Sequence, residues 1–137
     1  MRERTLLIIK PDGYSRNLAD PIFKRFTDNG FTIIERRDMT ISPELAAQHY
    51  AEHKEKPFYP SLIEYITSGP VAVAIAEGEN GVARARELMG ATDPAKANPG
   101  TIRGDFGESI DRNTIHGSDS LESAKREIRL YFADQAE

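Results

Sequence analysis

The sequence predicts an α+β fold of the ferredoxin-like βαββαβ type, in which a four-stranded, mostly antiparallel sheet carries surrounding helices. Three observations predict it. Short apolar runs typical of buried strands alternate with amphipathic segments typical of helices. Their order is strand, helix, strand, two helices, strand, helix, strand, helix, so a helical pair is inserted in the middle and one helix is appended. The length of 137 residues suits a single domain, residues 1–137, with a sizeable core.

The first strand is a nearly continuous apolar run over residues 5–9, as expected for a strand buried on both faces. Pro11-Asp12-Gly13 ends it, because proline cannot donate to a sheet and Asp-Gly favours a turn. Lys10 therefore lies at the C-terminal end of this strand, either beside a ligand or as a solvated edge residue. Asp20-Pro21 favours the start of a helix and Asn29-Gly30 its left-handed end.

The middle of the chain repeats this alternation. The apolar stripe of the first helix consists of Ile22, Phe23 and Phe26. Alternating apolar residues over 31–41 indicate a second strand, although Glu35 and Arg37 interrupt its apolar face. The elements expected next are helices at 43–52 and 60–67, a strand at 71–76 and a helix at 79–89.

Residues 90–112 lack hydrophobic periodicity. Compact domains seldom contain so long an irregular connection without a role, and Thr92, Arg103 and Arg112 offer polar groups for one. A very short strand at 114–117 and a final helix at 120–132 follow, and Asp119 or Ser120 caps that helix. The core stripe of the final helix consists of Leu121, Ala124, Ile128 and Phe132.

The composition excludes several functional classes. Hydrophobic residues make up 39% and charged residues 29%, as in folded globular proteins rather than disordered ones. The net charge of −4 argues against a dedicated nucleic-acid-binding protein but permits a local cationic cleft. There is no cysteine, and no signal peptide or membrane span fits the sequence. We therefore expect a cytoplasmic protein that does not associate with membranes.

His116 lies at the junction between the irregular region and the final helix. A ligand can reach an imidazole there while packed structure holds it on one side. Its ordinary pKa lies near neutrality, so a neutral, nucleophilic form is available. The residues around it do not distinguish a nucleophile from a surface histidine beside a helix cap.

Three groups of residues suggest chemistry. His49, Glu52 and His53 match the H-x-x-E-H pattern of one class of zinc hydrolases, in which two histidines four apart share a helix face. No third acidic ligand stands out downstream, and the helix breaks at Pro57. A helix near a ligand cleft, with partly exposed histidines, is the alternative.

The second group is cationic and the third is aromatic. Lys10, Arg86 and Arg103 form a polyphosphate site if the fold brings them together, because arginine binds phosphate in bidentate fashion and lysine acts as a point charge. Taken singly, each is an ordinary surface residue. After Pro57, Phe58 and Tyr59 are placed either to stack on a nucleobase or to fold back on the core.

Taken together, these motifs closely resemble the nucleoside diphosphate kinase family, essentially from end to end. The motifs that carry the resemblance are Leu7-Ile8-Ile9-Lys10-Pro11-Asp12-Gly13, His49-Tyr50 with His53, Lys56-Pro57-Phe58, Thr67-Ser68-Gly69-Pro70-Val71, Glu77-Gly78-Glu79-Asn80, Gly90-Ala91-Thr92-Asp93-Pro94, Pro99-Gly100-Thr101-Ile102-Arg103-Gly104-Asp105-Phe106 and Asn113-Thr114-Ile115-His116-Gly117-Ser118-Asp119-Ser120. The resemblance implies a ping-pong transfer of a terminal phosphate between nucleotides through a phosphohistidine at Nδ1 of His116.

The resemblance also implies roles for other residues. Glu127 orients the imidazole, Ser118 hydrogen-bonds Glu127 or the phosphate, and Tyr50 lies beside His116. Six residues bind the nucleotide. Lys10 contacts the γ-phosphate and the ribose 3′-hydroxyl, and Phe58 stacks on the base. The outer phosphates are held by Arg86, Thr92 and Arg103, and the ribose is bound by Asn113. Mg²⁺ is carried by the nucleotide phosphates, without direct protein ligands, and Asp119 reaches it through water. Broad base tolerance follows, since stacking accepts any base.

The family assembles as tetramers or hexamers, so we expect a homo-oligomer whose ligands are nucleoside tri- and diphosphates. The sequence departs from the family pattern at Tyr14 and at Asp20-Pro21. We expect these departures to affect local packing or subunit contacts, not the site residues. Two other functions compete with the kinase. They are a zinc hydrolase using His49, Glu52 and His53, and a non-catalytic ferredoxin-like regulatory or nucleic-acid-binding module.

Overall fold

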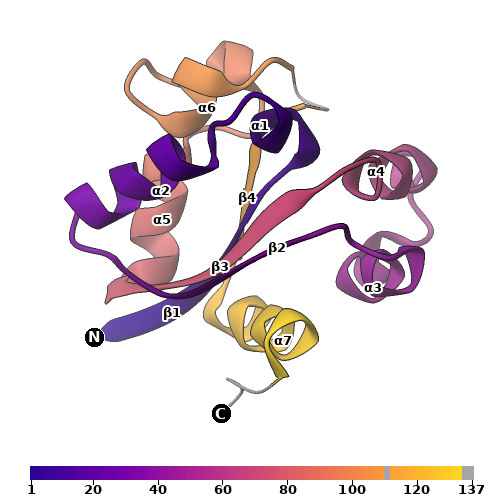
Figure 1. The fold of residues 1–137 in the computed structure, drawn as a ribbon, viewed down its shortest axis with the longest axis horizontal. Helices are drawn as coiled ribbons and strands as arrows, with labels where there is room; N and C mark the ends of the chain where they lie inside the picture. Colours follow the sequence, from indigo (N-terminus) through magenta and orange to yellow (C-terminus); the bar gives the residue numbers. More distant parts are fainter. Residues whose placement is uncertain (110–111, 134–137) are drawn as a thin grey trace.

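The computed structural model describes residues 1–109 and 112–133, and the strands in these ranges form one antiparallel sheet in the order β2-β3-β1-β4 (Figure 1). They are β1 (Arg2–Ile9), β2 (Thr32–Met39), β3 (Val71–Glu79) and β4 (Ile115–Gly117). This sheet confirms the predicted fold class. Its order places β4, which carries His116, at the edge opposite β2.

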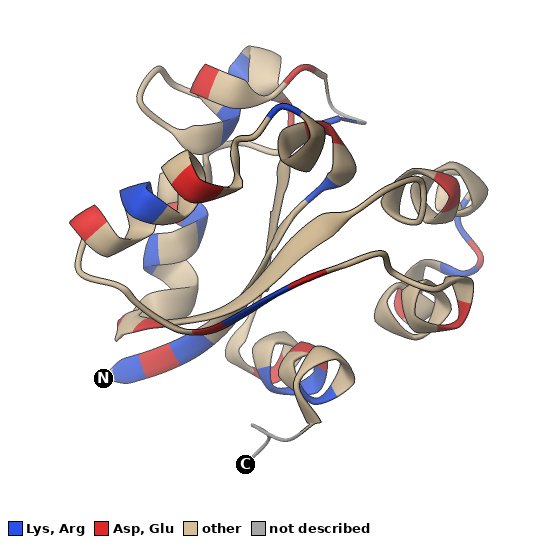
Figure 2. Ribbon diagram, in the orientation of Figure 1, with Lys and Arg blue, Asp and Glu red and all other residues tan. Residues whose placement is uncertain are grey.

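The two central strands are buried on both faces, as their apolar runs predicted. Residues 6–9 of β1 and 71–76 of β3 have no exposed surface, and the first six residues of β3 carry no charge (Figure 2). Both strands extend beyond the apolar runs. There the ladder continues between charged residues, such as Arg4 with Glu77 at 3.1 Å, because backbone pairing does not require apolar side chains.

Helices cover both faces of the sheet (Figure 1). On one face, α2 (Ala19–Asp28) and α5 (Gly81–Met89) pack with the short helix α6 (Ile102–Phe106). The predicted stripe of α2 is buried there through Ile22, Phe23 and Phe26. Each face of β1 and β3 therefore meets apolar side chains, which explains why these strands lack alternation.

The other face is covered by the inserted pair, α3 (Pro43–His49) and α4 (Tyr59–Ile66), and by the appended helix α7 (Leu121–Tyr131). Helix α3 ends at His49, earlier than the predicted residue 52. The chain then continues through a short 3-10 helix, η1 (Ala51–His53). No helix in the described ranges is both long and apolar enough to cross a membrane.

Several local predictions were wrong in detail. Asp20 does not cap α2; the helix begins at Ala19 after Leu18, and Asp20 lies in its first turn. Of the two residues predicted to cap α7, Asp119 and Ser120, the structure confirms Ser120, which accepts a hydrogen bond from the Ser123 amide at 3.0 Å. Leu121, predicted as part of the core stripe, is 37% exposed and lies outside the core, at the first residue of α7.

Two segments expected to be irregular are partly helical. The turn signal Pro11-Asp12-Gly13 begins a short helix, α1 (Pro11–Ser15), with the proline in its first turn, where a missing amide hydrogen costs nothing. Within the stretch 90–112 the structure contains 3-10 helix η2 (Pro94–Lys96) and α6, capped by Asp93 and Thr101. Residues 110–111 lie outside the described residues.

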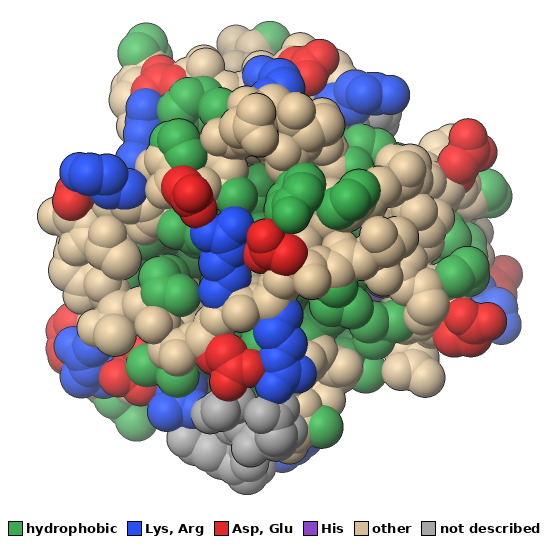
Figure 3. All heavy atoms as spheres, in the orientation of Figure 1, with side chains coloured by type: hydrophobic (Ala, Val, Ile, Leu, Met, Phe, Trp, Pro, Cys, Tyr) green, Lys and Arg blue, Asp and Glu red, His purple; other side chains and the backbone are tan. Residues whose placement is uncertain are grey.

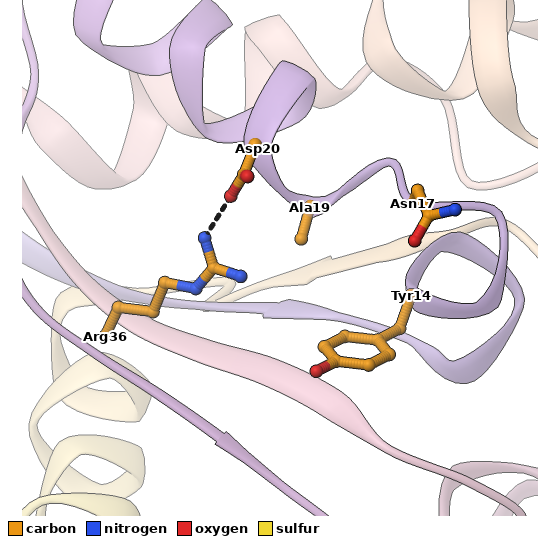
Figure 4. A pocket seen from close by; sticks show the side chains of 5 residues that line it. All are labelled: Tyr14, Asn17, Ala19, Asp20 and Arg36. Atoms are coloured by element: carbon orange, nitrogen blue, oxygen red, sulfur yellow. Dashed lines mark hydrogen bonds and ion pairs between the residues drawn. The ribbon is translucent and has the colours of Figure 1, made fainter.

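The two departures from the family pattern meet in a small hollow of about 160 Å³ between α1, α2 and β2 (Figure 4). Tyr14 donates a hydrogen bond to Asp38 at 3.0 Å, and Asp20 forms an ion pair with Arg36, which also binds Asp38. Because Arg36 belongs to β2, the hollow lies at the sheet edge opposite His116. These residues therefore compensate one another and stay clear of the candidate site.

Candidate active site

Strand pairing brings Lys10 next to the residues before His116. Because β1 and β4 are antiparallel, the C-terminal end of β1 meets the N-terminal end of β4. The Lys10 amide donates to the carbonyl of Thr114 at 2.8 Å, and its ammonium donates to Asn113 Oδ1 at 2.9 Å. Asn113 Nδ2 donates in turn to the carbonyl of Thr92 at 3.1 Å. Three predicted nucleotide-binding residues thus form one hydrogen-bonded group.

His116 is held by a carboxylate on α7. Its Nε2 lies 2.7 Å from Glu127 Oε1, which also accepts from the Ser118 hydroxyl at 2.9 Å. Burial raises the pKa of Glu127, but the hydrogen bond from His116 and its charge outweigh this and leave the pKa lowered. An ionised Glu127 accepts the Nε2 proton, so the lone pair of the His116 ring lies on Nδ1.

Glu127 and Ser118 are fixed from behind. Ser118 is fully buried, and its hydroxyl accepts from the Leu6 amide at 3.2 Å while its own amide donates to the Leu6 carbonyl at 3.2 Å. Glu127 is 4% exposed, whereas the His116 side chain is 17% exposed. The arrangement is therefore a rigid buried acceptor that holds a ring accessible to a ligand.

The three predicted cations converge without carboxylate partners. Burial, followed by the charge of Arg103, lowers the pKa of Lys10 to about 8. Burial, followed by the charge of Arg86, lowers the pKa of Arg103 to about 10. Arg103 donates to the carbonyls of Ile115 at 2.8 Å and Gly90 at 3.3 Å. In the described ranges none of the three forms an ion pair, so the charge there suits an anion.

A series of rings leads from the surface to His116. Phe58 is 50% exposed, and its ring centroid lies 5.7 Å from that of His53. The series continues from His53 to Tyr50 at 6.4 Å, from Tyr50 to His49 at 4.5 Å, and from His49 to His116 at 4.7 Å. Tyr50 thus approaches His116 across the His49 ring. Phe58 forms the exposed apolar end of the series.

A buried hub centred on the Asp12 carboxylate, which the sequence did not predict, supports the residues just before β4. Thr114, two residues before His116, adopts φ +78°, a left-handed conformation that is strained for a β-branched residue. Its hydroxyl donates to Asp12 Oδ2 at 2.8 Å, and the Tyr65 hydroxyl and Arg16 bind the same carboxylate. The Asp12 side chain is 1% exposed. An aspartate flanked by buried apolar residues was the available sequence signal.

We expect Asp12→Asn to lower the free energy of unfolding by about 2 kcal/mol, because the amide cannot accept from both hydroxyl donors and leaves a buried polar group unpaired. Urea unfolding measures this. Asp28→Asn is the control, since Asp28 pairs only with Lys24 on the surface, and it should change stability by less than about 0.5 kcal/mol. Equal effects of both substitutions would contradict the role of the hub.

The described residues fit magnesium poorly as a direct ligand set. Mg²⁺ requires oxygen ligands in near-octahedral geometry, whereas the one described grouping of histidine and acidic side chains close enough to share an ion is His49, His116 and Glu127. Asp119 is exposed, and the Ser123 hydrogen bond lowers its pKa, so Asp119 presents a negative charge to solvent. The H-x-x-E-H residues Glu52 and His53 do not join His49 in that grouping.

Comparison with known proteins gives one consistent result. A family model described as nucleoside diphosphate kinase matches residues 3–136. The chain is 59% identical to the nucleoside diphosphate kinase of Halalkalibacterium halodurans over 95% of this chain and 88% of that one. It is 54% identical to that of Nitratiruptor sp. over 97% of each chain. The crystal structure of the Aquifex aeolicus enzyme superimposes with a TM-score of 0.94, 41% identity and 96% coverage of both chains.

Proposed function

The chain belongs to the nucleoside diphosphate kinase family and has its activity, and from that premise we propose that His116 carries the phosphate in a ping-pong transfer. The observation that carries this proposal is the hydrogen bond from His116 Nε2 to the buried carboxylate of Glu127 at 2.7 Å. It fixes the tautomer in which Nδ1 is the free nucleophile.

Each half-reaction exchanges one bond to phosphorus. In the first, the Nδ1 lone pair attacks the γ-phosphorus of a nucleoside triphosphate, the bond to the bridging oxygen breaks, and the diphosphate leaves with that electron pair. In the second, a terminal oxygen of another diphosphate attacks the phosphohistidine and the P–N bond breaks. Glu127 stabilises the ring while it carries the phosphoryl group, because a negative acceptor offsets the positive charge that develops on the imidazole.

The cations supply most of the remaining stabilisation. Lys10 contacts the γ-phosphate and the ribose 3′-hydroxyl, Arg86, Thr92 and Arg103 hold the outer phosphates, and Asn113 binds the ribose. These roles are supported by the convergence of cations that form no ion pair within residues 1–109 and 112–133, near the Lys10–Asn113 hydrogen bond. Magnesium bound with the nucleotide would supply further neutralisation of the phosphate charge, and Asp119 is the residue that would contact it through water.

Phe58 is proposed to stack on the base, and Phe58→Ala tests this. Base stacking contributes about 1–3 kcal/mol, so we expect nucleoside diphosphate binding to weaken by about tenfold or more. The loss should be similar for adenine, guanine and cytosine, because every base has a π face. Calorimetric titration with the three diphosphates measures it. A loss confined to one base would contradict stacking, and an unchanged melting temperature is the control for folding, since Phe58 is half exposed.

We expect kcat/KM to fall as the pH rises through about 8. Burial, with the charge of Arg103, lowers the pKa of Lys10 to about 8. The ammonium is therefore present below that pH and lost above it, and phosphate binding weakens as it deprotonates. The pH profile of kcat/KM reports groups of the free enzyme and so measures this directly. In Lys10→Met the rate should be low at all pH values and the alkaline fall should disappear; a persisting fall would assign it to another group.

The central test uses γ-labelled ATP with magnesium, followed by quenching in alkali. A phosphohistidine retains label in base and loses it in acid, and any nucleoside diphosphate should release it as labelled triphosphate. Label that survives acid and is lost in base would indicate a carboxyl phosphate and overturn the assignment to histidine. Absence of label from chelator-treated wild-type protein supplied with magnesium would overturn the proposal.

Three further expectations belong to this proposal. The family match over residues 3–136 supports a single kinase domain over residues 1–137. We propose a homo-oligomer, tetramer or hexamer, supported by the outer edge of β2, which pairs with no strand in residues 1–109 and 112–133. Light scattering after gel filtration measures the subunit number. A cytoplasmic location follows from where nucleoside triphosphates are used. Basic and acidic side chains are interspersed on the face shown in Figure 3, consistent with no dedicated nucleic-acid binding.

A further inference from the structure

His49, His116 and Glu127 meet in a buried cluster that phosphate transfer does not fully use. We propose that these three side chains form a binding site for a zinc-type transition-metal ion, and that the bound ion blocks phosphorylation of His116. The blocking step rests on the proposed function of His116, whereas the metal site does not.

The geometry of the cluster is close to that of a three-ligand zinc site. His116 Nε2 lies 2.7 Å from Glu127 Oε1, and His49 Nε2 lies 3.9 Å from Glu127 Oε2. One ligand atom from each residue lies within 4.8 Å of the others. In tetrahedral zinc sites the ligand atoms lie about 2.0–2.2 Å from the ion, so they are roughly 3.3–3.5 Å apart. Because the ligand atoms are at most 4.8 Å apart, their separations need to change by no more than about 1.5 Å to match such a site.

An unpartnered nitrogen points to a ligand. The His49 side chain is 2% exposed, and its Nε2 has no hydrogen-bond partner among the described residues. Its other nitrogen, Nδ1, lies 2.7 Å from the Tyr131 hydroxyl. Histidines that bind metals commonly donate from the second nitrogen to a polar group, which fixes the ring and turns the free lone pair toward the ion. Tyr131 provides that support for His49.

The neighbouring cation does not fill the cluster. Arg126 approaches Glu127 Oε2 only to 4.0 Å, and its guanidinium donates to the backbone carbonyls of Gln48 and His49 at 3.1 and 3.2 Å. It is therefore tied to the end of α3. It does not lie at hydrogen-bond distance from the Glu127 carboxylate.

The ligand chemistry selects the metal. Two imidazole nitrogens and one carboxylate suit Zn²⁺, Co²⁺ or Cu²⁺, whereas Mg²⁺ takes oxygen ligands. Three protein ligands leave one position for water or a phosphate oxygen. The site is thus chemically distinct from the magnesium carried by the nucleotide.

Binding there would oppose phosphate transfer at His116. The ion takes the place of the Nε2 proton, which is released to solvent, and it uses the carboxylate charge that otherwise stabilises the ring. Metal coordination at Nε2 also withdraws electron density from the imidazole, so Nδ1 becomes a poorer nucleophile. The metal-loaded protein should therefore take up little phosphate from a triphosphate.

Titration of chelator-treated full-length protein with Co²⁺ tests the site without any phosphate transfer. We expect one ion per chain, the visible absorption bands of tetrahedral cobalt, and their loss when Zn²⁺ is added. His49→Gln should weaken Co²⁺ binding at least tenfold. The matched control is His53→Gln, which removes the histidine one turn further along and should bind as the wild type does. His116→Ala, at a partly exposed position, should also lose the bands and serves if His49→Gln does not fold.

The outcomes separate the two claims. Wild-type protein without tetrahedral bands, or His49→Gln binding as tightly as wild type, overturns the site. Equal weakening by His53→Gln also overturns it, because the neighbouring motif would then hold the ion. If the site is present, uptake of label from γ-labelled ATP should fall in proportion to bound Zn²⁺ and return on chelation. Metal binding that leaves uptake unchanged overturns the blocking step alone, and a metal-free wild type that takes up no label overturns the phosphohistidine proposal.

Discussion

Replacing His116 by alanine is expected to lower kcat/KM for phosphate transfer by at least about 10⁴-fold and to abolish the base-stable label, because no other group in the site can form the covalent intermediate. His49, whose ring lies 4.7 Å away, cannot substitute. Burial, followed by the charge of His116, lowers its pKa to about 3, and its side chain is 2% exposed, so a phosphate cannot reach it. Coupled spectrophotometric rates and label uptake measure the two effects.

The same variant should still bind nucleotide. Lys10 donates to Asn113, and Arg103 donates to the carbonyl of Ile115. Neither contact involves the His116 ring, so the dissociation constant for ADP should change by less than about threefold. His53→Gln is the matched control and should keep its phosphate uptake. Substantial label on His116→Ala would move the nucleophile elsewhere and remove the basis of the ping-pong proposal.

Local sequence signals predicted the fold because most elements are determined by their own residues. The apolar runs of β1 and β3 predicted strands buried on both faces, and the structure places helices on each side of them. Ends were predicted less well. The apolar run at 71–76 continues as strand β3 to Glu79 because its partner β1 pairs with it as far as Arg2. Helix α2 starts before Asp20, after Leu18, whose amide donates a hydrogen bond to the carbonyl of Gly13 in α1. Such ends depend on neighbours that a local pattern does not contain.

The candidate site was predictable only in part for the same reason. His116, Lys10 and Arg103 carry chemistry in their residue types, and family motifs tied them together. The hydrogen bond between Thr114 and Asp12 joins residues 102 positions apart. The two partners of His49 are Tyr131 and Glu127, and both come from α7, near the end of the chain. Strand register and helix docking create these contacts. No spacing rule in the sequence encodes them.

Register also explains why a partly exposed histidine can be a well-positioned nucleophile. His116 pairs with Ile8 in the ladder between β1 and β4, so the most buried strand neighbours fix its backbone. Ser118 is bonded to Leu6 in both directions, which carries the same rigidity to the carboxylate. The nucleophile and its supporting carboxylate are therefore built on the sheet and α7, whereas Thr92 and Arg103 come from the 90–109 region.

Glu127→Gln is expected to lower kcat by about 10²-fold while nucleotide binding changes little. The amide has the size of the carboxylate and keeps one acceptor oxygen for His116 Nε2, but it lacks the charge that stabilises the positive ring. Hydrogen bonds to charged groups are worth about 1.5–3 kcal/mol, against about 0.5–1.5 for neutral ones. The largest difference between these ranges, about 2.5 kcal/mol, corresponds to a loss approaching 10²-fold, and rapid-quench measurement of the first phosphate uptake should show it.

Ser118→Ala separates charge from geometry in this pair. It removes the hydrogen bond from the Ser118 hydroxyl to Glu127 Oε1 but leaves the carboxylate and its charge in place, so the fall in kcat should be only about tenfold or less. If Glu127 acts by stabilising the positive charge on the His116 ring, Glu127→Gln should also lower the single-turnover rate more than Ser118→Ala does. Neither substitution should then change the dissociation constant for ADP. Equal losses in both variants, accompanied by weaker ADP binding, would show that Glu127 serves folding of the α7 contact rather than the transfer step.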